Sequence, residues 1–208
     1  YHDRACAEPE REAAGAQVVA GSTYVEPAGL VGKAFALTWF FPLRSEDGPL
    51  RRAHSLFANN LAVRRELFES HPFPAIPGTS RGACLALAEQ LDRAGVAIIH
   101  NPRARVSHPA PSGFAHVSKR ALAQGRDYVL RERRRGRRLA ASWPASVARL
   151  LRHWTGSIWK IGTGFRRVGL HPLQTPAAVA VAAYYYLLFW LGETMLQLRL
   201  PAIRRVRI

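Results

Sequence analysis

The chain is poor in cysteine and in acidic residues, and it opens without an apolar segment. Its two cysteines, Cys6 and Cys84, lie far apart and form no Cys-x-x-Cys pair. A disulfide framework or a cysteine-based zinc site is therefore not expected, and the chain fits a reducing compartment. Residues 1–15 are polar and begin without Met, so we expect no signal peptide in them and a start that differs from the native one.

Acidic residues number 14 against 30 Lys and Arg in 208 residues, which gives a net charge of +16. The hydrophobic content of 48% is enough to build a core and excludes a disordered tail. The excess charge is concentrated, because residues 131–170 carry eleven basic residues and one acidic residue. The arginine run at 131–138 is a solvated surface, a nucleic-acid patch or a juxtamembrane anchor for anionic lipids.

Apolar segments late in the chain favour the membrane alternative. Residues 173–192 carry no charge, and twenty residues of helix span ~30 Å, the thickness of the hydrocarbon layer. This predicts a transmembrane helix, with a buried hairpin helix as the alternative, and we expect the hydroxyls of Tyr184–Tyr186 to face other helices or protein. In residues 146–170, apolar side chains recur every three or four positions with Arg and Lys between them, which predicts an amphipathic interfacial helix. The apolar run Leu30–Leu43 is too short to span a bilayer and predicts a buried or interfacial helix under the sheet.

Helix and strand patterns follow one another in residues 57–111. Apolar residues at helical spacing end at Gly95, which suits the left-handed turn that closes a helix, and Val96–Ile99 then has the pattern of a buried strand. Pro102 breaks this strand. A second short strand alternates up to His108, whose imidazole is expected to face inward with the apolar residues.

Two further elements flank this stretch. The apolar run Gln17–Ala20, closed by Gly21, predicts a buried strand. The pattern in residues 113–130 predicts a helix that is interrupted at Gly125.

One set of residues within 16–130 recurs in a known order and spacing: Asn59-Asn60, Ala62, Arg64-Arg65, Phe68, Gly82, Leu87, Leu91, Gly95, Pro102, Ala104, Val106 and His108. Together they resemble the second half of the catalytic domain of family 2 glycosyltransferases, which have the GT-A fold. This resemblance implies an α/β fold in which the C-terminal half of a GT-A, Rossmann-like domain is followed by the amphipathic interfacial helix and the transmembrane helix.

The resemblance implies transfer of a hexose from a nucleotide-sugar donor to a lipid-linked or saccharide acceptor, usually with inversion, and with a divalent metal such as Mg or Mn. A GT-A domain begins with a nucleotide-binding βαβ half that carries an Asp-x-Asp metal motif, and neither appears in this chain. We therefore expect a piece of a longer protein that is inactive alone, with most metal ligands outside it.

The catalytic residues implied by the resemblance depart from the family pattern. The family places a Glu-Asp pair after the glycine that matches Gly82, whereas this chain has Ala83 and Cys84 there. A thiol is mostly protonated at neutral pH unless a neighbouring cation stabilises the thiolate, so Cys84 is a poor copy of an Asp base. Three alternatives follow: a base from elsewhere, such as Glu89 or Asp92; an acceptor acidic enough to need little help; or a chain that is not catalytic.

The candidate binding residues each have a structural alternative. Asn59 and Asn60 bind ligand hydroxyls or hold an irregular turn, and Arg64 reaches a diphosphate or forms a solvated helix face. Arg81 and Gly82 lead into a helix whose free N–H groups attract anions.

His108 binds metal or diphosphate, as the resemblance implies, or is a hydrogen-bonded structural residue. We expect His108 and the helix that begins at Gly82 to converge on one sugar-sized cleft.

The predicted organisation has four parts. Residues 1–130 form the catalytic portion, 131–172 the basic interfacial segment, 173–198 the transmembrane helix and 199–208 a basic tail. Because the larger positive charge precedes the span, we expect the catalytic portion on the cytoplasmic face, with anionic membrane lipids as partners and no nucleic acid. A non-catalytic glycosyltransferase-like membrane scaffold is the alternative, and a nucleic-acid-binding protein is the third and least supported.

Overall fold

The computed structural model describes residues 15–39, 41, 43, 48–75, 77, 79, 82–136 and 143–204. The chain divides into two compact units. One, here called the sheet unit, comprises residues 1–25, 41–75 and 82–108, and the other, the helical unit, comprises residues 26–40, 76–81 and 109–208.

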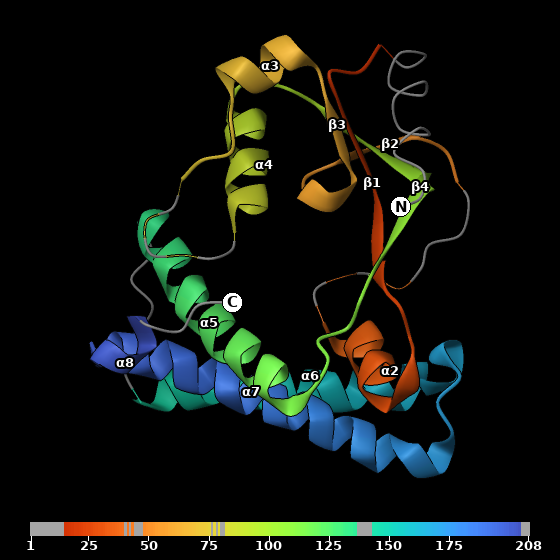
Figure 1. The fold of residues 1–208 in the computed structure, drawn as a ribbon, viewed down its shortest axis with the longest axis vertical. Coiled ribbons are helices and arrows are strands. Elements are labelled where there is room, and N and C mark those ends of the chain that lie inside the picture. Colours follow the sequence, from red (N-terminus) through yellow and green to blue (C-terminus); the bar gives the residue numbers. More distant parts are fainter. Residues whose placement is uncertain are drawn as a thin grey trace. The chain divides into compact units, whose positions relative to one another are not determined.

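The sheet unit is built on a four-stranded mixed sheet, which confirms the α/β class (Figure 1). Strands β1 (Val18–Val25) and β4 (Ile98–His108) pair in parallel at its centre. Strand β2 (Arg51–Ala53) is antiparallel to β4 and strand β3 (Leu61–Val63) is antiparallel to β1. Parallel central strands are buried on both faces, which agrees with the uninterrupted apolar start of β1.

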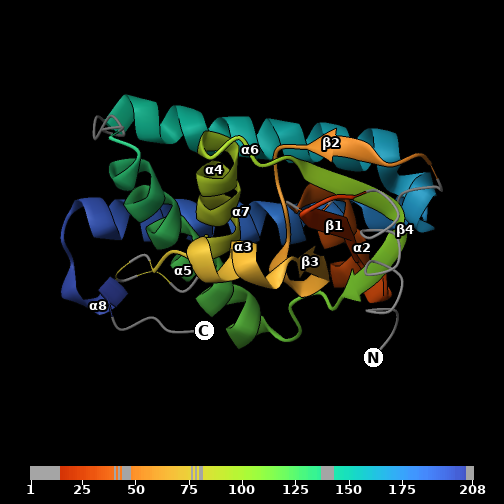
Figure 2. The same ribbon diagram turned by 90° about the horizontal axis from the view of Figure 1, so that it is seen from above.

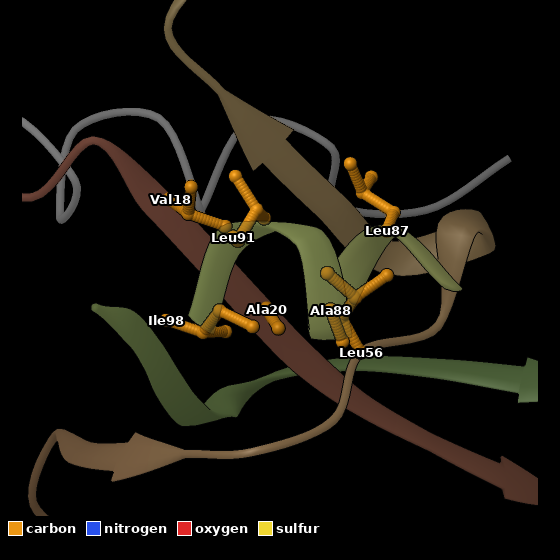
Figure 3. Packing of buried hydrophobic residues seen from close by; sticks show 7 residues of the cluster. All are labelled: Val18, Ala20, Leu56, Leu87, Ala88, Leu91 and Ile98. Atoms are coloured by element: carbon orange, nitrogen blue, oxygen red, sulfur yellow. The ribbon is translucent and has the colours of Figure 1, made fainter. Parts of the chain in front are cut away.

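Helix α4 (Ala83–Arg93) covers one face of this sheet and supplies its core. Figure 3 shows the contact between side chains of the strands, of α4 and of the loop residue Leu56; the residues are Val18, Ala20, Leu56, Leu87, Ala88, Leu91 and Ile98. The helix ends at Gly95, whose φ of 72° is left-handed and whose N–H donates to the Asp92 carbonyl. The predicted helix and its glycine stop are therefore confirmed.

The prediction of two strands separated at Pro102 is wrong, because β4 is a single strand with a bulge at that point. Its register against β1 jumps from Gly21 opposite Asn101 to Ser22 opposite Arg105. The intervening residues include Pro102, whose missing N–H falls where the ladder is already interrupted. The bulge therefore accommodates Pro102 without ending the strand, and β4 pairs with β1 again as far as His108.

The loop that carries the Asn pair returns beside this bulge. Residues Ala58–Asn60 form the short 3-10 helix η1, which leads directly into β3, and helix α3 (Arg65–Ser70) follows. Helix α3 buries no residue fully, and its exposed Arg65 and Glu69 form an i,i+4 ion pair at 2.8 Å.

The helical unit is arranged around helix α7 (Thr175–Gln197), against which α2 (Gly29–Thr38), α5 (Phe114–Arg134) and α6 (Trp143–Gly164) pack. Figure 2 gives a second view of these helices. The 3-10 turns η2 and η3 join α6 to α7, and the short helix α8 follows; their bounds are Phe165–Val168, Pro172–Gln174 and Pro201–Arg204. The helix predicted over 146–170 is present as α6 with η2. The helix predicted over 30–43 is present as α2 but ends at Thr38, and it packs on α6 and α7 in the helical unit, whereas it was expected under the sheet.

Helix α5 runs without interruption through Gly125, so the predicted break there is wrong. The glycine serves a close helix crossing instead. A Cβ on Gly125 would lie 2.8 Å from the Phe189 carbonyl carbon and 3.0 Å from the Glu193 nitrogen, and one on Gly192 would meet the Leu122 carbonyl. Backbone therefore meets backbone between α5 and α7, as small residues permit where helices pack closely.

Among the described residues, one helix, Pro172–Gln197, is long and apolar enough to cross a membrane. The prediction for its tyrosines is confirmed. Tyr184 bonds Ser118 of α5 at 2.7 Å, Tyr185 bonds Gln124 of α5, and Tyr186 donates to the Thr38 carbonyl of α2 at 2.7 Å. Each hydroxyl is thereby satisfied inside the unit.

The division into two units differs from the predicted domain boundaries. Helices α2 and α5 belong to the helical unit, although α2 and most of α5 fall within the predicted catalytic portion, 1–130. The physical reason is that both helices bury their apolar faces against α7.

Candidate functional site

The two asparagines of η1 have different surroundings. Asn60 is buried, and its Nδ2 donates to the carbonyls of Ser22 at 3.1 Å and Ala104 at 2.9 Å, the two strands that separate at the bulge. This is the structural alternative, a side chain that holds irregular backbone in place. Asn59 is exposed, and its Oδ1 accepts a hydrogen bond from the hydroxyl of Thr23 at 3.3 Å. Because Thr23 is a buried residue of β1, this bond orients the whole Asn59 amide, including its NH₂ group, at the surface.

His108 lies at the end of β4 beside aromatic rings. It is in register with Val25, and its imidazole lies 5.0 Å from the ring of Phe41, which itself packs on Phe57 at 4.8 Å. Side chains alternate along β1, so Thr23 and Val25 share one face of the sheet. Asn59 and His108 therefore lie on the same face, about two residues apart along the strand direction.

The expected convergence of His108 with the helix that begins at Gly82 is wrong. Helix α4 packs on the face that carries Val18 and Ala20, whereas His108 pairs with Val25, an odd number of residues further along β1. Strand alternation places the two features on opposite faces of the sheet. Sequence patterns alone could not predict this, because the face that carries His108 depends on the register between β1 and β4.

The three catalytic candidates on α4 do not converge. Cys84, in the first turn, is half-buried and packs against the apolar cluster beneath the helix. At ~1.5 Å per residue, Glu89 lies ~8 Å and Asp92 ~12 Å further along the axis. Glu89 is partly buried and Asp92 is exposed. Neither carboxylate therefore stands where the family's acidic pair would be.

The cationic and helix-start candidates are only partly within the described residues. Gly82 has a φ of 104°, and its carbonyl accepts the first bond of α4 from Ala86. Arg64 precedes α3, is exposed and donates its backbone N–H to Gln17. Arg81 lies outside the described residues.

A hydrogen-bonded row on β1, β4 and β2 was missed by sequence reasoning. His100 Nε2 lies 3.0 Å from Ser22 Oγ, and Arg51 Nε donates to His100 Nδ1 at 3.4 Å. Burial, and then the charge of Arg51, lower the pKa of His100. Because Nδ1 accepts from a guanidinium, the ring proton is on Nε2 and points at Ser22, so the histidine is not arranged as a base for that serine.

The described residues hold no group of three His, Cys, Asp or Glu that could bind a metal ion. His108 alone among the sequence candidates has a metal-binding side chain on the Asn59 face, and one imidazole is not a site. A divalent metal at this face would need further ligands.

Comparison of the chain with models of protein families, with curated proteins and with solved structures finds no match.

Proposed function

We propose that the chain is part of a membrane-attached glycosyltransferase of the family 2 type, with a GT-A catalytic domain to which the sheet unit belongs. It would transfer a sugar from a nucleotide-sugar donor to a lipid-linked or membrane-proximal acceptor. The observation that carries the proposal is the placement of Asn59 and His108, two residues of the resemblance, on one face of a mixed sheet at the ends of strands. Strand ends in α/β folds are where ligands bind.

Membrane attachment is supported by the surface of α7. Helices on the surface of a soluble protein expose polar residues. The exposed residues of α7 are instead apolar throughout: Pro176, Ala177, Ala180, Leu187 and Leu191. The lipid of a membrane is the environment that suits such a surface. In this proposal the sheet unit acts on the cytoplasmic side, because nucleotide sugars are found there.

The catalytic base in this proposal comes from outside α4. Cys84 is half-buried against the apolar cluster beneath α4, and the carboxylates of Glu89 and Asp92 lie one to two turns beyond it. Asn59 would orient a sugar hydroxyl through its amide.

Transfer by the complete protein in membranes, supplied with radiolabelled nucleotide sugars and extracted lipid acceptors, tests the proposal. We expect Asn59→Ala to lower transfer without changing the melting temperature, because the side chain is exposed. Asn60→Ala, the matched control, should lower the melting temperature. No transfer and no donor hydrolysis with any common nucleotide sugar would refute the enzyme proposal.

A non-catalytic scaffold is the second candidate, favoured by the packed Cys84 in place of an acid. Transfer by the wild type would itself contradict a scaffold-only role. Cys84→Ser and Glu89→Gln, with Asp92→Asn as a control on the exposed side of α4, test whether α4 supplies a residue needed for transfer. Loss of transfer in either of the first two variants, with the fold retained, would show that α4 does. Unchanged transfer in both variants would show that neither Cys84 nor Glu89 is the base.

A further inference from the structure

Helices α6 and α7 lie side by side and run in opposite directions. Trp190 Nε1 donates to Ser146 Oγ at 2.7 Å, and Trp154 Nε1 donates to the Ala183 carbonyl at 3.1 Å. The residue number rises along one helix as it falls along the other, and the two bonds are eight residues apart on α6 and seven on α7. While these contacts persist, the two helices share the same depth in a membrane.

Helix α6 carries charges that do not belong in the hydrocarbon layer. Arg152 and Lys160 are exposed, and cations at the bilayer centre are strongly disfavoured. Arg149 points inward instead and forms an ion pair with Glu193 of α7, Nε to Oε2 3.4 Å. An α6 that stays at the membrane surface keeps its partner α7 there too, so α7 does not cross the bilayer in this packing.

The exposed apolar residues of both helices lie on a common face. Leu151 and Ile158 of α6 are 50% and 52% exposed, and Leu187 and Leu191 are exposed on α7. Successive residues of a helix are about 100° apart around its axis, and the residues that touch the other helix show which side of each helix faces its partner. With α6 and α7 oriented in this way, these four side chains all lie on one side of the plane through the two helix axes. Trp159, 68% exposed, lies at the outer edge of this face.

Charge indicates which surface covers the apolar face. No Asp or Glu occurs between Glu132 and Glu193, a stretch that contains ten Lys and Arg residues. Arg152 follows Trp159 around α6, and Lys160 lies further on, away from the apolar face. The two helices therefore carry apolar side chains on one side, Trp159 at the edge and the cations Arg152 and Lys160 away from the apolar side. This arrangement suits the surface of an anionic bilayer, where apolar groups enter the hydrocarbon and cations meet the headgroups.

We propose that α6 and α7 form an in-plane hairpin whose shared apolar face, Leu151, Ile158, Leu187 and Leu191, enters one leaflet of an anionic membrane, so that the chain approaches and leaves α7 on the same side. This rests on the membrane attachment proposed above and names its geometry. Arg152 and Lys160 contact the anionic headgroups.

Labelling of the complete protein in sealed membrane vesicles tests the geometry. Cys6 and Cys84 are replaced by Ser, and single variants Leu173→Cys and Leu198→Cys mark the two ends of α7, both of which are well exposed. A maleimide that cannot cross membranes should react with both variants from the same side. Reaction from opposite sides would overturn the in-plane hairpin while leaving membrane attachment and transferase activity untouched.

Depth is measured with a fluorescent label on Ile158→Cys and, as a matched control on the charged side of α6, on Thr163→Cys. Brominated lipids should quench the first label and spare the second. Replacing Arg152 and Lys160 by Gln should reduce quenching at position 158 in anionic vesicles but not in neutral ones. Equal quenching of both labels, or a cross-link between two copies through Ile158→Cys without quenching, would overturn the proposal in favour of a buried or dimeric face.

Discussion

A methyl group added at Gly125 tests the helix crossing that holds the helical unit together. In Gly125→Ala the new Cβ would lie 2.8 Å from the Phe189 carbonyl carbon and 3.0 Å from the Glu193 nitrogen. These are backbone atoms of α7, so the clash is relieved only when the helices move apart. Overpacking costs typically 1–3 kcal/mol, and we expect the upper end, about 3 kcal/mol.

The matched control is Gly156→Ala in α6, where an added Cβ meets nothing within 4 Å. Alanine is the better helix former, so this variant should gain about 0.5–1 kcal/mol. At about 2–4 °C per kcal/mol for a chain of this size, Gly125→Ala should melt about 6–12 °C lower and Gly156→Ala slightly higher. Melting is followed by circular dichroism of the purified protein. A Gly125→Ala variant as stable as the wild type would refute the close crossing.

Three further predictions concern polar side chains of the two units. Asn60→Ala removes the amide that donates to the Ser22 and Ala104 carbonyls and should cost about 2 kcal/mol or more, whereas Asn59→Ala should cost under about 0.5 kcal/mol, as measured by urea unfolding. Arg149→Met and Glu193→Gln should each lower the free energy of unfolding by about 3 kcal/mol, because each leaves one charge of the buried ion pair without its partner. The double variant should be more stable than either single variant, which a double-mutant cycle measures. The pKa of His100 is lowered on folding, so its contribution to stability is present above the unfolded value of 6.5 and is lost as pH falls toward the folded pKa; His100→Gln should flatten the pH dependence of the melting temperature below that value.

Features set by short-range pattern were predictable from the sequence. The apolar positions of α4 repeat at helical spacing and the stop at Gly95 needs only a positive φ, so both were identified. The tyrosine hydroxyls of α7 were expected to find partners for the same kind of reason, because an apolar helix gives a phenol no other donor or acceptor. Local physical chemistry determines such features.

Features set by a distant partner were not predictable. Pro102 signals a strand break in isolation, but Asn60, some forty residues earlier, supplies the amide that holds the bulge. Gly125 alone predicts a break in the helix. Its role in a close crossing is apparent only when α7, with Gly192, is placed against α5. For the candidate site, the register between β1 and β4 decides that His108 faces away from α4, and no spacing in the sequence encodes that register.

The most direct test of the proposed function is product formation by the complete protein in membranes, measured as label moved from a nucleotide sugar to a lipid extract, for the wild type and for Asn59→Ala. We expect transfer by the wild type and a clear loss in the variant at an unchanged melting temperature. Absence of any labelled product or free labelled sugar from the wild type, across the common donors, would contradict it.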